Sequence, residues 1–221
     1  MCKPQLILFD VNETLLDLKP LARRINAILS NELAFELWFS TLLQYSLVET
    51  VSGKHQDFSK IAKATFKMTA AKFKKVFAED EIDNILSLIT KLPAHSDVAK
   101  SLASLKNQNY TLVALTNGNA QVAKEQLAFA EIAMYFDRIF SVDEVAAFKP
   151  SAKPYQYVLS EMQIDPADAL LVAAHGWDIT GAQRARLKTA FIAREGKFKY
   201  PLAEKPTFDC KDLTELVESL T

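Results

Sequence analysis

QLILFDVNET, residues 5–14, is the stretch that decides how this chain folds. The segment from Gln5 to Phe9 is a short, mostly apolar run, which is typical of a strand buried on both faces of a parallel sheet. The run ends at Asp10, and the polar residues after it predict a loop. Ligands of open parallel sheets bind beyond the carboxyl ends of the strands, so Asp10 stands where we expect the chemistry.

A long helical segment follows this strand. Between residues 18 and 92 apolar side chains recur at helical spacing, and no credible strand interrupts them. We expect about four helices here, closed by Pro93. The sequence therefore predicts two units, an α/β core made of residues 1–17 and 93–221 and a helical cap subdomain made of residues 18–92.

The remainder of the chain alternates between strand-like and helix-like segments. Strands are expected at residues 110–115, 138–141, 170–174 and 189–193, and helices at residues 97–108, 120–130, 153–162 and 179–186. Strands and helices that alternate at this spacing predict βαβ units. The fold class is therefore expected to be α/β, with a doubly wound parallel sheet of the Rossmann-like type and an inserted all-helical cap.

Composition excludes several classes of protein. The chain has 221 residues, of which 49% are hydrophobic, so it can bury a sizeable core. Its 26 basic and 27 acidic residues leave no basic surplus, which argues against nucleic acid as a partner. The longest apolar runs, such as Ala169 to Ala174, are far shorter than a membrane-spanning helix needs. We therefore expect neither nucleic acid nor a membrane as a partner.

The cysteines and the N-terminus bear on the location of the protein. Cys2 and Cys210 have neither the spacing of a metal site nor the density of a disulfide scaffold. The N-terminus runs directly into the first strand without the pattern of a secretory signal. We expect a cytoplasmic protein with two reduced thiols.

Chemically active residues cluster where the predicted strands end. They are Asp10, Asn12, Thr14, Thr116, Asn117, Lys149, His175, Trp177 and Asp178. A carboxylate such as Asp10 needs nearby positive charge to stay ionised as a nucleophile, and Lys149 can supply it. The hydroxyl and backbone amides around Thr116 can hold anionic oxygens. Asp178 can hold the lysine or position a water.

Each of these residues alone also has a structural interpretation. An aspartate after a strand is more often a helix N-cap than a nucleophile, and the Thr-Asn-Gly-Asn run at residues 116–119 is also an ordinary turn followed by a helix start. His175 stays open between a structural loop histidine, a donor to a leaving group and a base for water. Suitable groups at four strand ends together favour the functional interpretation.

The motifs resemble those of the haloacid dehalogenase superfamily. The matching segments are residues 7–15 (ILFDVNETL), 115–119 (LTNGN), 148–150 (FKP) and 177–178 (WD). The helical segment is similar to the cap of this superfamily. The resemblance implies that Asp10 is the nucleophile, that Thr116 and Asn117 bind substrate oxygens, and that Lys149 steadies the nucleophile. It also implies that Asp178 orders the loop or the water.

Two departures separate this chain from the phosphatases of the superfamily. Phosphatases carry an acid/base aspartate where this chain has Asn12, and an amide cannot exchange a proton in that way. They also hold Mg²⁺ with an aspartate where this chain has Ala173, which cannot ligate a metal. Both departures indicate the metal-free branch, similar to the type II 2-haloacid dehalogenases. Tyr155, six residues after Lys149, fits that branch as a substrate-binding residue.

Two cap residues of this chain differ from those of the type II 2-haloacid dehalogenases. Phe39 stands where the family has an arginine that binds the leaving halide, and Leu42 stands at a nearby position where the family has a polar residue. We expect an apolar pocket wall and weak activity on simple chloroacids. The sequence thus predicts a hydrolase with no metal and no cofactor, in which Asp10 forms an ester with a small 2-substituted carboxylic acid that water then hydrolyses.

Two alternatives to this function stay open. One is a divergent phosphatase that acts on a small phosphomonoester, and the other is a binding protein of the same fold that has lost turnover. The intact Asp10, Lys149 and Asp178 weigh against the binding protein, while Phe39 and Ala173 leave it open. A homodimer is a further expectation, because dimers are usual among similar proteins.

Overall fold

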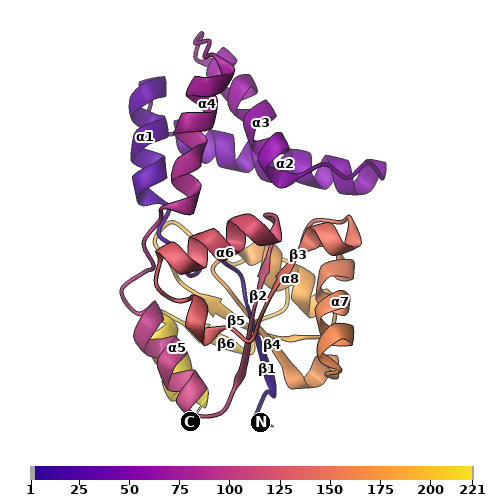
Figure 1. The fold of residues 1–221 in the computed structure, drawn as a ribbon. Coiled ribbons are helices and arrows are strands. Elements are labelled where there is room, and N and C mark those ends of the chain that lie inside the picture. Colours follow the sequence, from indigo (N-terminus) through magenta and orange to yellow (C-terminus); the bar gives the residue numbers. More distant parts are fainter. Residues whose placement is uncertain (1–2, 221) are drawn as a thin grey trace.

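The computed structural model describes residues 3–220, which form a central sheet flanked by helices, with further helices beyond one end of the sheet (Figure 1). The strands are β1 (Leu6–Phe9), β2 (Thr111–Thr116), β3 (Arg138–Ser141), β4 (Ala169–Ala173), β5 (Lys188–Ile192) and β6 (Phe208–Cys210). The α-helices are α1 (Lys19–Leu29), α2 (Ala34–Ser52), α3 (Phe58–Lys72), α4 (Glu79–Leu86), α5 (Val98–Asn107), α6 (Ala120–Phe129), α7 (Ala152–Met162), α8 (Gly176–Arg184) and α9 (Leu213–Leu220). Short 3₁₀ turns lie at η1 (Ser87–Thr90), η2 (Ala133–Tyr135), η3 (Val142–Val145) and η4 (Pro166–Asp168).

The strands are parallel and lie in the order β3-β2-β1-β4-β5-β6. The central strand is β1, in which Leu6 pairs with Thr111 of β2 on one side and with Ala169 of β4 on the other. The strand order reverses at β1, and such a switch point leaves a crevice beyond the carboxyl ends of the strands. Asp10 is the first residue after β1, so it lies at the mouth of that crevice.

Alternate side chains of β1 pack in two hydrophobic cores on opposite faces of the sheet. Ile7 and Phe9 pack in the core that includes α5, α6 and α9, whereas Leu6 and Leu8 pack in the core that includes α7 and α8. All four side chains are fully buried. Burial on both faces explains the continuous apolar run, and each side chain contributes about 1.5–3 kcal/mol to folding.

Helices α1 to α4 lie beyond the carboxyl ends of the strands, and we call them the cap helices (Figure 1). Their own core is aromatic: Trp38 of α2 meets Phe66 of α3 edge to face, with ring centroids 6.4 Å apart. The indole of Trp38 donates to the carbonyl of Ala62 at 3.0 Å, so this buried N–H is satisfied inside the cap. Asp57 caps the start of α3 by accepting from two backbone amides.

Two linkers join the cap helices to the sheet, and they lie side by side. The backbone N–H of Asp17 donates to the carbonyl of Pro93 at 2.8 Å. Arg194, which follows β5, binds both linkers, because its Nη2 donates to the carbonyl of Thr14 at 3.0 Å and its Nη1 lies 2.8 Å from Asp97. These contacts fix the chain on either side of the cap helices.

The predicted fold class is confirmed, since the sheet is parallel and the cap is helical. The sequence analysis did not predict β6 and α9, and α8 begins at Gly176, three residues before its predicted start. The division into units at residues 17/18 and 92/93 stays a prediction. No helix within residues 3–220 is long and apolar enough to cross a membrane. Of the two cysteines, Cys2 lies outside the described residues and Cys210 is buried with a free thiol.

Candidate active site

Four strand ends meet around Asp10. Phe9, the last residue of β1, pairs with Ala114 of β2 and Val172 of β4, so the loops that follow these strands start side by side. Lys149 comes from the loop before α7, and Asp178 comes from the first turn of α8. The parallel register therefore brings side chains that are far apart in the sequence to one edge of the sheet.

Asp10 is held by three side chains. Its Oδ1 accepts from Lys149 Nζ at 2.8 Å, and its Oδ2 accepts from the Thr14 hydroxyl at 2.6 Å. Nδ1 of His175 lies 3.0 Å from the same Oδ2. The Thr14 hydroxyl also accepts from the backbone N–H of Ala174 at 3.0 Å, which fixes its direction. Both carboxylate oxygens are thus oriented in a site where Asp10 is only 5% exposed.

Lys149 is a buried cation between two carboxylates. Its Nζ donates to Asp10 Oδ1, to Asp178 Oδ2 at 2.7 Å and to the carbonyl of Leu115 at 3.0 Å. These acceptors use all three protons of the ammonium group. Burial lowers the pKa of Lys149, but the charges of Asp10 and Asp178 outweigh it and raise the pKa above its usual value. Lys149 therefore stays charged at neutral pH.

Asp178 is fixed from behind by Tyr155. The Tyr155 hydroxyl donates to Asp178 Oδ1, and both residues are completely buried. Gly181 makes this packing possible, because a Cβ at that position would lie 2.7 Å from the Tyr155 hydroxyl and 2.5 Å from Cβ of Pro150. Tyr155, which the sequence analysis expected to bind substrate, lies behind Asp178 and lines neither of the cavities described below.

A second cation, His175, contacts the other carboxylate oxygen of Asp10. Nδ1 of His175 contacts Asp10, and its Nε2 lies 2.9 Å from Oε2 of Glu13. Burial lowers the pKa of His175, but its bonds to Asp10 and Glu13 raise it to about 9. Burial raises the pKa of Asp10, yet Lys149 and His175 together hold it well below its ordinary value. Asp10 is therefore an ionised carboxylate at neutral pH.

Thr116 is the last residue of β2, and Asn117 follows it beside this network. Oδ1 of Asn117 accepts from the backbone N–H of Lys149 at 2.9 Å, whereas its Nδ2 is buried without a partner in the described part of the chain. The Thr116 hydroxyl accepts from the N–H of Gly118 at 3.0 Å, so its proton is left to donate elsewhere. Asn119 caps α6, as the turn-and-helix interpretation of this motif expected.

A small apolar cavity lies between this edge of the sheet and the cap helices. Its volume is about 260 Å³, and its walls include Asn12, Trp38, Phe39, Leu42, Gly118 and Gln126. Gln126 donates to Oδ1 of Asn12 at 2.9 Å, which fixes the Asn12 side chain at the wall of this cavity. The ring of Phe39 stacks on His175, with centroids 6.5 Å apart, so the aromatic wall reaches the residues that hold Asp10.

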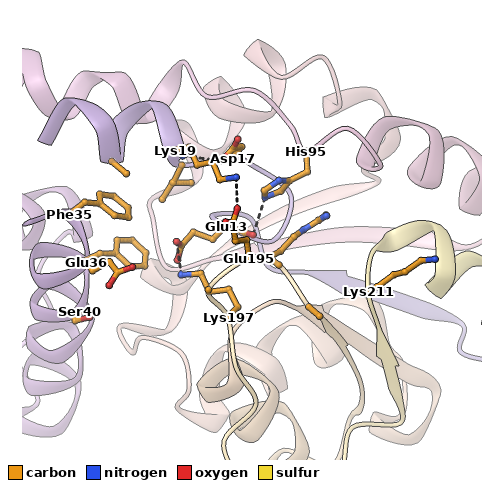
Figure 2. Close-up of a pocket in the computed structure, with 16 residues that line it drawn as sticks. Glu13, Asp17, Lys19, Phe35, Glu36, Ser40, His95, Glu195, Lys197 and Lys211 are labelled. Carbon is orange, nitrogen blue, oxygen red and sulfur yellow. Dashed lines mark hydrogen bonds and ion pairs between the residues drawn. The ribbon is translucent and has the colours of Figure 1, made fainter. Parts of the chain in front are cut away.

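A larger, polar cavity of about 710 Å³ is also lined by Phe39. Figure 2 shows this cavity. Glu13, Lys19, His95, Glu195 and Lys197 line it, and Figure 2 shows the ion pairs that Lys19 makes with Glu195 and Lys197 makes with Glu13. None of the motif residues that contact Asp10 lines this cavity. These residues do not line the smaller cavity either, but its walls include Asn12, two residues after Asp10, and Gly118, which follows Asn117, so we propose it as the substrate cavity.

The donor groups do not fit the Mg²⁺ site of the superfamily's phosphatases. Ala173 stands where those enzymes supply an aspartate, and the oxygens of Asp178 are taken by Lys149 and Tyr155. Among residues 3–220, no three His, Cys, Asp or Glu side chains are grouped to hold a metal ion. Mg²⁺ needs several oxygen ligands in near-octahedral geometry, so these residues do not supply its site.

Sequence reasoning did not single out Glu13 and Lys197. Glu13 has a φ of 63°, in the left-handed region that side chains rarely adopt, and its Oε1 accepts from Lys197 Nζ at 2.6 Å. A glutamate next to a nucleophile motif was a signal that could have been used. Lys197 lies beyond the last predicted strand and carried no signal of its own.

Comparison with known proteins shows the family. A family model described as haloacid dehalogenase-like hydrolase matches residues 4–186, so the chain belongs to this family of hydrolases. Among similar proteins, (S)-2-haloacid dehalogenase 1 of Pseudomonas sp. (strain CBS-3) is 27% identical over 161 residues, which are 73% of this chain and 71% of that protein. (S)-2-haloacid dehalogenase 4A of Burkholderia cepacia is 25% identical over 96% of this chain and 90% of that protein.

A solved structure shares the fold over nearly the whole chain. It is the L-2-haloacid dehalogenase of Xanthobacter autotrophicus with chloropropionic acid covalently bound, with a TM-score of 0.91, 22% identity and 97% of each chain covered. The predicted family and its resemblance to the 2-haloacid dehalogenase branch are confirmed. The roles of the individual site residues, the homodimer and the cytoplasmic location stay predictions.

Proposed function

We propose that this protein is a metal-independent hydrolase in which Asp10 displaces a leaving group from C2 of a small 2-substituted carboxylic acid. The ester formed on Asp10 is then hydrolysed by water. The observation that carries the proposal is the state of Asp10, an ionised carboxylate at a sheet switch point whose oxygens are aimed by Lys149, Thr14 and His175. A carboxylate that is kept charged and fixed in direction is prepared for attack on carbon.

The unpartnered amide of Asn117 supports a carboxylic acid as the substrate. Leaving a buried N–H donor unsatisfied costs about 1–3 kcal/mol, which a bound carboxylate oxygen would recover. The free proton of the Thr116 hydroxyl supplies a second donor nearby. Lys149 is fully used by its own acceptors, so we assign the substrate carboxylate to Asn117 and Thr116 rather than to the lysine.

The substrate cavity supports a small and partly apolar substrate. A volume of about 260 Å³ lies just below the usual range of ligand cavities, and Trp38, Phe39 and Leu42 contribute an apolar wall. Such a wall accepts a halogen or an alkyl group on C2. Lys63 also lines the cavity, but it is already paired with Asp83, so we propose no free cation for a departing halide. We therefore propose a 2-haloacid or a related 2-substituted acid, turned over more slowly than by an enzyme that has an arginine at position 39.

The relatives support the same chemistry. The similar proteins from Pseudomonas and Burkholderia are named (S)-2-haloacid dehalogenases, and the Xanthobacter enzyme is described with chloropropionic acid covalently bound. A covalent adduct in a protein of this fold is the intermediate that attack by a carboxylate would form.

The test follows the oxygen atoms. In a single turnover in H₂¹⁸O with enzyme in excess, we expect the label in the tryptic peptide that contains Asp10 and none in the product. Direct attack by water on the substrate predicts labelled product and an unlabelled peptide, which would refute the covalent mechanism. The substrates are 2-halopropionates and a panel of phosphate monoesters, each with EDTA or with added Mg²⁺. Turnover of phosphate esters that requires Mg²⁺ would overturn the proposal in favour of a phosphatase.

A further inference from the structure

Glu13 combines a charged side chain with an uncommon backbone conformation. Its φ of 63° lies in the left-handed region, which glycine adopts without cost and other residues adopt at the expense of stability. Such a residue persists only where the surroundings fix it, and these positions gather at functional sites. The contacts that fix the Glu13 carboxylate therefore indicate a functional role for this residue.

The Glu13 carboxylate joins a lysine to an imidazole. Its side chain is only 11% exposed, and its Oε1 accepts from Lys197 Nζ at 2.6 Å. Its Oε2 lies 2.9 Å from Nε2 of His175. Figure 2 shows Glu13 and Lys197 meeting at the wall of the polar cavity. Burial raises the pKa of Glu13, but His175 and Lys197 outweigh it and lower the pKa below its ordinary value.

Both ring nitrogens of His175 face carboxylates. Asp10 and Glu13 only accept hydrogen bonds when ionised, so each nitrogen must carry a proton and the ring is an imidazolium. The rings of Phe39 and Trp177 stack on the imidazole, with centroids 6.5 Å and 5.1 Å away. The ring plane is thus fixed with Nδ1 toward the reacting carboxylate and Nε2 toward Glu13.

Gly176 lets the segment that carries Lys197 come close to His175. A Cβ at Gly176 would lie 2.6 Å from the carbonyl oxygen of Phe198 and 2.7 Å from the backbone nitrogen of Tyr200. Three segments therefore converge here: the loop after β1, the start of α8 and the stretch after β5. They form one chain of alternating charge, Asp10, His175, Glu13 and Lys197.

We infer that His175 is the base that activates water for hydrolysis of the Asp10 ester, and that Glu13 is the residue that positions it. The inference rests on the proposed function, since it requires an ester on Asp10. The charged groups that face His175 are Asp10 and Glu13, with Lys149 behind the first and Lys197 behind the second. Esterification removes the charge of Asp10, and with it one of the two carboxylates that hold the imidazolium proton.

The protons and bonds balance over the two half-reactions. Asp10 forms a bond to C2 as the C2–halide bond breaks, and the electron pair leaves with the halide. The imidazolium, now beside an uncharged ester, releases its Nδ1 proton to solvent, which accounts for the acid formed overall. A water then attacks Cγ of Asp10 while Nδ1 takes its proton. The intermediate expels the alkoxide, which takes the second water proton from the carboxyl group of Asp10, so that the products are the Asp10 carboxylate and the hydroxyl of the 2-hydroxy acid.

Half-reaction kinetics test this assignment. Halide release and Asp10 esterification, followed by quenched flow and intact-protein mass spectrometry, separate formation of the ester from its decay. For His175→Asn we expect a halide burst of one equivalent, accumulation of the ester and decay slowed by about 10² or more. For Glu13→Gln, which keeps an acceptor but loses the charge, we expect decay slowed by about tenfold on the high-pH plateau, where His175 is neutral in both proteins. Glu195→Gln, in the neighbouring exposed ion pair, should leave both half-reactions unchanged.

The pH profile of ester decay distinguishes positioning from a structural role. Decay in the native protein should rise with pH as His175 loses its proton, and Glu13→Gln should move that rise to lower pH. A change that only loosens the loop would lower the rate equally at every pH and would overturn the role of Glu13. Glu13→Gly, which suits the left-handed backbone, provides the same readout if Glu13→Gln folds poorly.

Two results would overturn the inference in distinguishable ways. If His175→Asn slows the halide burst and no ester accumulates, His175 acts in the first half-reaction and the inference is wrong while the proposed function stands. If the native protein forms no ester and releases no halide from any 2-haloacid, the proposed function itself fails, and the inference fails with it.

Discussion

The sheet side and the cap side of the candidate site are built on opposite principles. On the sheet side, Asp10, Lys149, Asp178 and His175 are all buried, and each is paired with at least one opposite charge among them. On the cap side the walls are apolar, as at Phe39, and the polar atom of Trp38 is bonded within the cap. In the proposed reaction, the charged groups come from the sheet side, and the apolar wall that would contact the substrate comes from the cap side.

This difference predicts how the two sides respond to change. Buried charges depend on one another, because the removal of one partner leaves another uncompensated in a region of low polarity. An apolar wall has no such dependence, and volume-conserving changes there cost little. Substitutions on the sheet side should therefore abolish function or folding, whereas substitutions on the cap side should tune rate and specificity.

The largest effect is expected from Asp10→Asn. The amide is nearly isosteric but is not a nucleophile, so turnover of 2-haloacids should fall by at least about 10³-fold while the fold is retained. Halide release and circular dichroism measure the two quantities. Asp10→Ala excludes activity regained through deamidation, and the exposed Asp165→Asn serves as the matched control. Appreciable turnover by both Asp10 variants would remove Asp10 from the reaction.

Lys149→Met breaks the charge network at its centre. It leaves the Asp10 and Asp178 carboxylates buried without their shared cation, so the free energy of unfolding should fall by about 3–5 kcal/mol. Urea denaturation at neutral pH measures this loss. Lys106→Met, which removes a surface lysine paired with Asp137, should cost no more than about 1 kcal/mol. Equal losses in the two variants would contradict the contrast between buried and exposed charges.

The charge of His175 should appear in the pH dependence of stability. Its pKa is raised in the folded protein from 6.5 to about 9, so its stabilising contribution is complete below pH 6.5 and is lost as the pH rises through about 9. The loss is on the order of 3 kcal/mol for the isolated group. His175→Asn should remove this slope in urea denaturation across that interval. Parallel curves for the variant and the native protein would show that His175 is neutral in the folded state.

Phe39→Arg tests the cap side and should give the smallest effect. It places a cation on the apolar wall where a halide would leave, so turnover of 2-chloropropionate should rise by roughly tenfold if Phe39 lines the leaving-group side. Phe39→Leu keeps the wall apolar and is the control, with turnover within a few-fold of the native protein. Brisk dechlorination by the native protein, unimproved by the arginine, would show that another group already serves the halide.

Much of the fold was predictable because local patterns and tertiary burial agree. The apolar run of β1 and the alternation after Pro93 predicted a parallel sheet, and both cores depend on that pattern. The strand β6 was missed because it has only three residues and lies at the edge of the sheet. The spacing of Leu213, Leu216 and Leu220 did contain the signal for α9, and all three are buried.

The site was predictable only as far as strand ends define it. The proximity of Asp10, Lys149 and Asp178 follows from the parallel register, so sequence reasoning reached it. The direction of Glu13 depends on a left-handed backbone residue, and the distance between Glu13 and Lys197 depends on how the stretch after β5 folds over Gly176. Neither leaves a periodic pattern in the sequence. Tyr155 was assigned to the right neighbourhood but not to its position behind Asp178.

The paired linkers determine how the cavity can open. The backbone of Asp17 is hydrogen-bonded to that of Pro93, and Arg194 contacts both Thr14 and Asp97. The two linkers are therefore held together as one segment that is anchored to the sheet. A swing of the cap helices to admit substrate would therefore pivot beyond Asp17 and Pro93. The groups that orient Asp10 lie on the anchored side of that pivot, so entry of a substrate need not disturb the orientation of the Asp10 carboxylate.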